Sequence, residues 1–308
     1  MSTQLVIFIQ QVINGLKIGS VYALVALGYT MVYGIIRLIN FAHGDFIMVG
    51  SYTLLYTIPL MVALGMPAWV AVVLAIAVCV MVGITVEKVA YKPVRKKGTN
   101  MSALITAIAM SLFLENFAQT IFGAAPKPIG TIFSFPDMVF GSIKLNGNTM
   151  LTIIIGVTVM IALQFFVKKT KMGKAMRAVS EDGEAAILMG INKNRTITIT
   201  FAIGSSLAAI ASLMYSASYP QATPTIGSML GLKAFIAAVL GGIGIIPGAM
   251  LGGIVVGLAE SLTKAYIGSL TGGIITSAFS DAIVFGILII VLIVKPSGIL
   301  GKNVGEKV

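Results

Sequence analysis

The sequence predicts an all-α, polytopic integral membrane protein, and three observations support this fold class. Of its 308 residues, 57% are hydrophobic and 10% are charged, whereas soluble globular domains carry roughly 25% charged residues. The mean hydropathy of the chain is +1.01. Several apolar stretches also reach the ~20 residues that a helix needs to cross a bilayer. We therefore expect one transmembrane domain over residues 1–308, a helix bundle with about eight or nine crossing helices.

Nine apolar segments follow one another along the chain, and each is expected to form one membrane helix. They cover residues 18–36, 46–65, 68–90, 101–122, 149–167, 196–218, 228–246, 248–268 and 272–294. The preceding stretch, LVIFIQQVING, is short and is interrupted by Gly15 and then Lys17, so we expect an interfacial helix or a broken start of the first crossing. The pair over 228–268 has two interpretations, because GGIGIIPG either connects two full crossings or forms the tip of two helices that do not fully cross.

Small residues in the segment 248–268 are spaced for close helix packing. Gly248 and Gly252 form a GxxxG pattern, and so do Gly253 and Gly257. Lipid provides no hydrophobic drive between membrane helices, so helices associate where small residues allow their backbones to approach. We expect these glycines to form contact faces.

Basic residues identify the cytoplasmic side. If the segments alternate across the membrane, 16 of the 21 Lys and Arg residues fall on one side. They are Arg37, Lys88, Lys92, Arg95, Lys96, Lys97, Lys168, Lys169, Lys171, Lys174, Arg177, Lys193, Arg195, Lys295, Lys302 and Lys307. The opposite side has Lys127 and Lys144. Because cytoplasmic loops carry the excess of Lys and Arg, we expect the N-terminus outside and the C-terminus inside, and no nucleic-acid partner despite the net charge of +11.

A short charged insert, RAVSEDGEAAILMGINKNR over 177–195, separates two of the apolar segments. Ser180 and Asp182 are both suited to cap the start of a helix, and Gly190 is suited to its left-handed end. The helix between them has about two turns, which is too short to be stable alone in water. It must therefore dock, either on the protein's own membrane-proximal surface or on a cytoplasmic partner.

Polar residues within the apolar segments are the candidates for a translocation pathway, because charged groups in a membrane are costly. One group lies in NFAHGDF, at the cytoplasmic start of the second segment, and another is the glycine-rich break at 241–244, a feature that lines cavities in some transporters. Asp281 is the most isolated acid, nine residues into the last segment. We expect it to face protein or a polar cavity, with Lys233 or Lys17 as its partner. The pathway candidates are Asn40, His43, Asp45, Gly241, Gly242, Gly244 and Asp281.

Other features argue against chemistry in the chain itself. The sequence has one His and one Cys, so no metal site is expected. It has no phosphate-binding loop of the GxxxxGK[ST] type, so any ATP hydrolysis must come from another subunit. Glu260 precedes Lys264 by four residues, a spacing typical of a structural ion pair on a helix. We expect no catalytic residue and no cofactor.

Five motifs in order make the sequence recognisable. INFAHGDFIMVGSY (39–52), VAYKPVR (89–95), RAVSEDGEAAILMGIN (177–192), KAFIAAVLGGIGIIPGAMLGG (233–253) and PSGILG (296–301) stand in this order along the chain. Together they resemble the permease subunit of high-affinity branched-chain amino-acid ABC transporters, over essentially the whole length. The Glu-Ala-Ala and the following Gly of the insert look like the coupling loop of ABC importer permeases, here over about 168–195.

This resemblance implies an assembly and a mechanism. A second, homologous permease subunit pairs with the chain, two cytoplasmic ATPase subunits dock beneath, and a soluble binding protein delivers leucine, isoleucine or valine from outside. Transport follows alternating access in the inner membrane of a bacterium, among membrane lipid. The residues expected to couple to the ATPases are Glu181, Asp182, Glu184, Ala185, Ala186 and Gly190.

Three other interpretations remain open at this point. A related ABC permease for urea or short amides has a similar sequence. An ion-coupled secondary transporter would use the intramembrane acids as proton or sodium sites, but these acids are scattered along the chain. A non-transporting membrane subunit of an energy-converting complex is the third, and neither of the last two explains the cytoplasmic insert.

Overall fold

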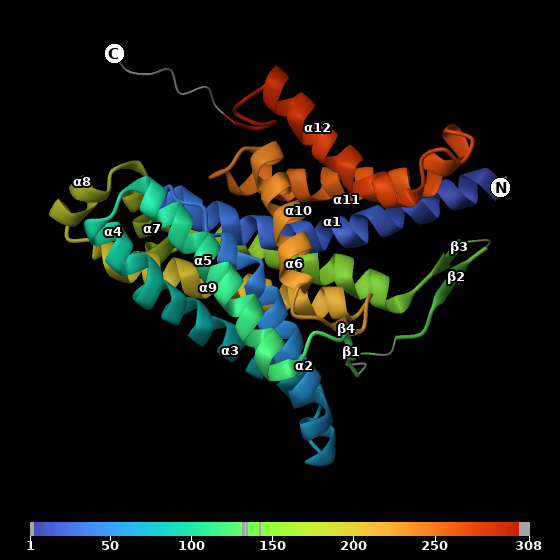
Figure 1. Cartoon of the computed structure of the whole chain (residues 1–308), viewed down its shortest axis with the longest axis horizontal. Helices are drawn as coiled ribbons and strands as arrows, with labels where there is room; N and C mark the ends of the chain where they lie inside the picture. Colours follow the sequence, from blue (N-terminus) through green and yellow to red (C-terminus); the bar gives the residue numbers. More distant parts are fainter. Residues whose placement is uncertain (1–2, 131–132, 134, 142, 302–308) are drawn as a thin grey trace.

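The computed structural model describes residues 3–130, 133, 135–141 and 143–301 as a bundle of α-helices with four very short strands (Figure 1). Eight helical segments in this part of the chain are long and apolar enough to cross a membrane, which confirms the predicted fold class. Their main helices are α1 (Thr3–Ile36), α2 (Asp45–Ala63), α3 (Trp69–Val86), α5 (Asn100–Phe122), α6 (Gly147–Lys169), α9 (Lys193–Ser216), α11 (Ile246–Leu270) and α12 (Ser280–Val294). A further apolar helix, α10 (Ile226–Gly241), is shorter.

The first helix is continuous over 34 residues, so the expected interfacial helix or broken start is wrong. Gly15 does not interrupt α1, because its role is to allow a close approach between helices. A Cβ atom on Gly15 would lie 2.9 Å from the Cα of Leu258 in α11. The missing side chain therefore lets α1 and α11 pack along much of their length, a gain in contact that offsets the low helix propensity of glycine.

Helix α11 uses two glycine faces to hold two neighbours. Gly253 and Gly257 lie against α1, where a Cβ on either would overlap the backbone of Ala23 or Gly19. Gly252 lies against Ala237 of α10 in the same way. The GxxxG patterns are thus contact faces, as predicted, and α11 packs between α1 and α10.

Replacing Gly257 with valine is expected to lower the stability of the chain by about 1–3 kcal/mol, because overpacking a tight contact forces the backbones apart. The measurement is thermal unfolding of the purified protein in detergent. The matched control is Gly286→Val in α12, since a Cβ there meets nothing within 4 Å. Equal melting temperatures for the two variants would contradict the close approach of α1 and α11.

The chain turns back into the bundle after α1. Arg37 has a φ of 51°, and a short 3-10 helix (Phe41–His43) precedes α2. His43 packs against Gly28 of α1, and that glycine lies about 12 Å from the end of α1 at 1.5 Å per residue. The sequence predicts that the segment NFAHGDF lies at the cytoplasmic end of the bundle, and this is wrong. The residues between α1 and α2 that are not α-helical fold back into the bundle, so His43 lies beside Gly28, well before the end of α1.

The third crossing is longer than expected. Helix α3 continues through a π-helical turn (Glu87–Tyr91) into α4 (Lys92–Lys97), whereas the sequence analysis ends this helix at residue 90. Pro93, which has no backbone N–H, comes just after this π-helical turn, where the regular α-helical hydrogen bonding is already interrupted. The helix therefore carries the basic residues of VAYKPVR to its own end.

The C-terminal third departs from the expected segments in two places. Helix α10 has 16 residues and ends at Gly241, so the last residues of the segment 228–246 form a turn and not a helix. This turn has Gly242 and Gly244 at φ of 106° and 90°, values that favour glycine. Helix α12 begins at Ser280, which places Asp281 in its first turn and not nine residues inside it, because Gly272 and Gly273 at positive φ form the loop after α11.

The two ends of the bundle are different. In Figure 1, α4 lies toward one end with α7 (Lys171–Glu181) and α8 (Gly183–Leu188), and the N-terminus lies at the other with β2 (Met138–Phe140) and β3 (Ile143–Leu145). The strands β1 (Lys127–Pro128) and β4 (Gln221–Ala222) pair antiparallel, as do β2 and β3. A second 3-10 helix (Ser277–Phe279) precedes α12. The end that carries α7 and α8 is called the coupling end below.

Candidate functional site

The charged insert contains the expected short helix, α8, which follows the end of α7 and precedes the start of α9. Asp182 caps α8: its Oδ1 accepts hydrogen bonds from the backbone N–H of Glu184 at 2.9 Å and of Ala185 at 3.0 Å. These two bonds hold the pKa of the Asp182 carboxyl below its usual value. Ser180 is not a cap, because it lies inside α7 and its hydroxyl donates to the carbonyl of Gly34 at 2.5 Å.

The end of α8 matches its prediction. Gly190 has a φ of 82°, and the following N–H, of Ile191, donates to the carbonyl of Ala186 at 3.0 Å. This geometry is typical of a glycine-terminated helix. Glu184 forms an ion pair with Lys193 at 2.9 Å, which joins the start of α8 to the start of α9.

The tip of α8 is apolar and exposed. Leu188 and Met189 are 88% and 83% exposed, and Ile187 is exposed as well, whereas Ala186 is buried beneath them. Glu181, Asp182 and Glu184 are exposed on the same loop. These residues, 181–189, are called the α8 tip below, and they combine acidic groups with an uncovered apolar patch at the coupling end.

Helix α7 connects the α8 tip to the membrane helices. Its N-cap is Thr170, whose hydroxyl accepts from the N–H of Gly173 at 3.0 Å. Met176 and Val179 are buried, and Ser180 holds the end of α1 through the bond to Gly34.

A small cavity of about 70 Å³ beneath α7 is lined by residues of α1, α6 and α7 together with Gly244 and Ile246. Helix α7 is therefore bonded directly to the end of α1, and the turn between α10 and α11 lies across the cavity from it.

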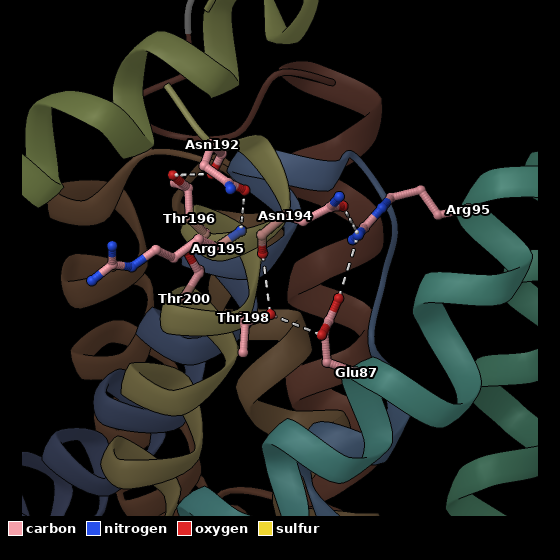
Figure 2. A network of polar contacts seen from close by, with 8 residues as sticks. All are labelled: Glu87, Arg95, Asn192, Asn194, Arg195, Thr196, Thr198 and Thr200. Atoms are coloured by element: carbon pink, nitrogen blue, oxygen red, sulfur yellow. Dashed lines mark hydrogen bonds and ion pairs between the residues drawn. The ribbon is translucent and has the colours of Figure 1, made fainter. Parts of the chain in front are cut away.

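A polar network joins the other side of the insert to the π-helical turn and α4, which continue α3 (Figure 2). Asn192 caps α9 by accepting from the N–H of Arg195 at 3.0 Å, and Asn194 accepts from the guanidinium of Arg95 at 3.1 Å. The same guanidinium lies 3.3 Å from Oε1 of Glu87.

Glu87 is the centre of this network. Its side chain is completely buried, and its Oε2 accepts from the hydroxyl of Thr198 at 3.0 Å. Figure 2 shows Glu87 reaching from the π-helical turn toward α9. Glu87 is not among the site residues expected from the sequence, although a Glu at the end of an apolar run, eight residues before an Arg, is a signal that marks it.

A second charged cluster joins four helices in the other half of the bundle. Oε1 of the buried Glu260 lies 2.9 Å from Nζ of Lys233 and 2.5 Å from Nζ of Lys264. Its Oε2 accepts from the hydroxyl of Tyr22 at 2.6 Å. Lys233 also lies 2.7 Å from Oδ1 of Asp281. The expected pair of Glu260 with Lys264 is confirmed, and Asp281 pairs with Lys233, one of its two expected partners.

The remaining pathway candidates lie in separate places. The amide oxygen of Asn40 accepts from the hydroxyl of Tyr91 at 2.7 Å, and the His43 ring packs edge-on against Tyr29 with centroids 4.9 Å apart. Asp45 is buried.

Gly241 and Gly242 form the turn after α10, where the N–H groups of Ile299 and Leu300 donate to the carbonyls of Leu240 and Gly241. Asp281 belongs to the other cluster, so the structure does not bring all the candidates together. Within the described residues, no three His, Cys, Asp or Glu side chains are grouped so as to hold a metal ion.

Comparison with known proteins places these features in a family. A profile of the family described as "Branched-chain amino acid transport system / permease component" matches residues 11–292. The chain is 43% identical to the high-affinity branched-chain amino acid transport system permease protein LivH of Escherichia coli K12, over 100% of both chains. It is 42% identical to the corresponding protein BraD of Pseudomonas aeruginosa, over 98% of both. Among solved structures, PsaBC from Streptococcus pneumoniae in complex with Fab gives a TM-score of 0.47 at 16% identity, covering 94% of this chain and 92% of that one. With its family profile and its full-length relatives, this multi-pass membrane protein belongs to the permease components of branched-chain amino acid transport systems.

Proposed function

We propose that the chain is the membrane-spanning subunit of an ATP-driven importer that carries leucine, isoleucine and valine into the cytoplasm. The single observation that carries this proposal is the identity of 42–43% with the LivH and BraD permease proteins over essentially the full length. Both relatives are described as parts of high-affinity branched-chain amino acid transport systems. The chain itself is not catalytic.

The proposed partners are two cytoplasmic ATPases, a second homologous permease and a soluble binding protein. The α8 tip supports docking of an ATPase, because Leu188 and Met189 leave apolar side chains exposed beside three acidic ones. Uncovered apolar side chains of this kind mark protein contact sites more often than solvent-facing surface. The sequence also has no phosphate-binding loop of its own, so ATP must be hydrolysed by a partner.

The proposed coupling runs through both sides of the insert. A push on the α8 tip moves α7, which holds the end of α1 through Ser180 and Gly34. It also moves the start of α9, which is bonded through Asn194, Arg95 and Glu87 to α4 and the π-helical turn that continue α3. Closure of the two ATPases would thus tilt α1 and α3 together, and the pathway would alternate between its two sides.

The coupling end is proposed to face the cytoplasm, with the C-terminus on the same side. The bias of 16 basic residues against 2 supports this orientation. The Gly241–Gly244 turn and the Asn40–Asp45 segment are proposed to close the inner part of the pathway. Both are backbone breaks that pack against other helices or the C-terminal segment, as in transporters whose discontinuous helices line the pathway.

The test is affinity purification of the tagged chain from its native membranes, with the co-purifying proteins identified by mass spectrometry. We expect a second permease of the same family and ATPases with phosphate-binding loops. The recovered complex in liposomes should accumulate leucine only when ATP and the binding protein are present. A chain that purifies alone, in a form that is folded and intact, would contradict ATP coupling.

A further inference from the structure

A charged cleft opens in the half of the bundle away from the coupling end. It consists of two cavities, of about 220 Å³ and about 280 Å³. The two cavities share four lining residues, which are Ile18, Tyr219, Glu260 and Lys264. At ~30 Å³ per water molecule, the larger cavity alone has room for a small organic solute. We call the two together the outer cleft.

Its depth is given by the helices that line it. Lys17 lies 19 residues before the end of α1, or about 28 Å at 1.5 Å per residue. Lys264 lies 18 residues after the start of α11, or about 27 Å. Gly34 near the end of α1 lies against Gly244, which comes just before α11, so both distances are measured from the same end of the bundle. The outer cleft therefore lies near the side from which an importer receives its substrate.

The outer cleft has more unused hydrogen-bond donors than unused hydrogen-bond acceptors among its charged side chains. Glu260 has little capacity to spare, since Lys233, Lys264 and Tyr22 already donate to its two oxygens and occupy three of its roughly four acceptor positions. Lys264 has a single acceptor among the described residues and is 45% exposed. Lys17 lines the smaller cavity and has no ion pair within the part of the chain that the structure describes. Unused N–H donors at the cleft therefore outnumber unused carboxylate acceptor positions.

The net charge of the outer cleft also favours an anionic ligand. Three lysines, Lys17, Lys233 and Lys264, stand against two carboxylates, Glu260 and Asp281. A cavity with low-dielectric walls and an excess of one positive charge attracts an anionic group. Ammonium donors on a membrane helix can satisfy a carboxylate with charge-assisted hydrogen bonds.

The rest of the larger cavity is apolar and aromatic. Ile226, Met229 and Leu230 line one part of it, and they provide contacts for an aliphatic side chain. The rings of Tyr215 and Tyr219 lie 4.9 Å apart on another part. The faces of such rings attract an ammonium group, so the cavity has a surface for each part of an amino acid.

We propose that the outer cleft is the first site at which the membrane subunit holds its amino-acid substrate. Lys264 and Lys17 bind the α-carboxylate, the tyrosine rings face the ammonium, and the aliphatic wall receives the side chain. This inference rests on the proposed function, because it takes the substrate class from it.

The experiment measures binding of radiolabelled leucine to the complete, nucleotide-free transporter in nanodiscs of neutral lipid, without the binding protein. Lys17→Met and Lys264→Met should each weaken binding about tenfold, since each removes a charge-assisted hydrogen bond. Lys264→Arg should retain most of the affinity. Lys88→Met is the matched control, because it removes one charge from an exposed position outside the cleft. With wild type, 4-methylpentanoate, which has the carboxylate but no amine, should compete with leucine better than leucinol, which has the amine but no carboxylate.

The outcomes separate this inference from the proposed function. If wild type imports leucine with ATP and both methionine variants bind and import it normally, the outer cleft is not the substrate site. The same holds if the variants lose only bound phosphatidylglycerol, measured by native mass spectrometry, because the lysines then bind a lipid headgroup. If wild type assembles with its partners but imports no leucine, the proposed function fails, whatever the lysines do. Lys17→Met is the more informative variant, because Lys17 has no described ion pair whose loss would disturb the fold.

Discussion

Changing both Glu181 and Asp182 to lysine is expected to abolish ATP-driven leucine uptake while the chain still inserts into the membrane. The double change puts a positive charge at the N-cap of α8, where the helix dipole favours a negative one, and a second positive charge beside it. It also removes the side-chain oxygen that accepts from the N–H groups of Glu184 and Ala185. Both effects loosen the α8 tip without touching the buried helices, so an ATPase would lose the structure on which it docks.

The measurement compares uptake into liposomes with co-purification of the ATPases. Asp182→Asn is the control, because asparagine keeps an oxygen for the two backbone N–H groups but has no charge. If the cap is what matters, this variant retains uptake, and if the charge matters, it loses uptake with the lysine variant. Normal uptake by the double lysine variant would remove the coupling role from this loop.

The second large effect is expected at Glu260. Replacing it with leucine leaves the buried Lys233 with Asp281 alone and removes the acceptor of Lys264 and Tyr22. Removing one partner of a buried ion pair costs about 3–5 kcal/mol when the other charge is left alone. Here Lys233 keeps Asp281 and Lys264 is 45% exposed, so we expect a loss near the lower end of that range. We expect the variant to accumulate poorly and to unfold at a lower temperature in detergent.

A rescue variant distinguishes this cause from loss of packing. Lys233→Met and Asp281→Asn, added to Glu260→Leu, remove the remaining buried pair and leave Lys264, which is 45% exposed, as the charge that stays in the cluster. Replacing a whole buried ion group by apolar residues is often neutral for stability, so the triple variant should recover most of the melting temperature. A triple variant as unstable as Glu260→Leu would mean that the shape of the Glu260 side chain, and not its charge, holds α1, α10 and α11 together.

Several features of the fold follow from local patterns. The apolar segments predict the helices because a chain in lipid must satisfy its backbone polar groups within each segment. Asp182 and Gly190 mark the ends of α8 because caps depend on residues close in sequence. The spacing of Glu260 and Lys264 predicts their ion pair for the same reason. The five family motifs are also recognised from the linear sequence alone, because each is a continuous stretch and they follow one another in a fixed order.

Other features depend on contacts between residues far apart in the sequence. Gly15 looks like an interruption in the sequence, but in the fold it is the point where α1 meets Leu258. Ser180 is suited to a cap, but a carbonyl 146 positions earlier takes its hydroxyl. Glu87 gains Thr198 as a partner from a helix that begins more than 100 residues later.

The charged groups within the membrane helices show most clearly which features the sequence predicts and which depend on tertiary packing. The sequence indicates that Lys17, Lys233, Lys264, Glu260 and Asp281 are unusual in a membrane protein, and it offers two partners for Asp281. The packing of α1, α10, α11 and α12 selects Lys233 and leaves Lys17 facing a cavity. Composition and spacing limit which residues can pair, but the distances that decide each pair arise only when the helices pack.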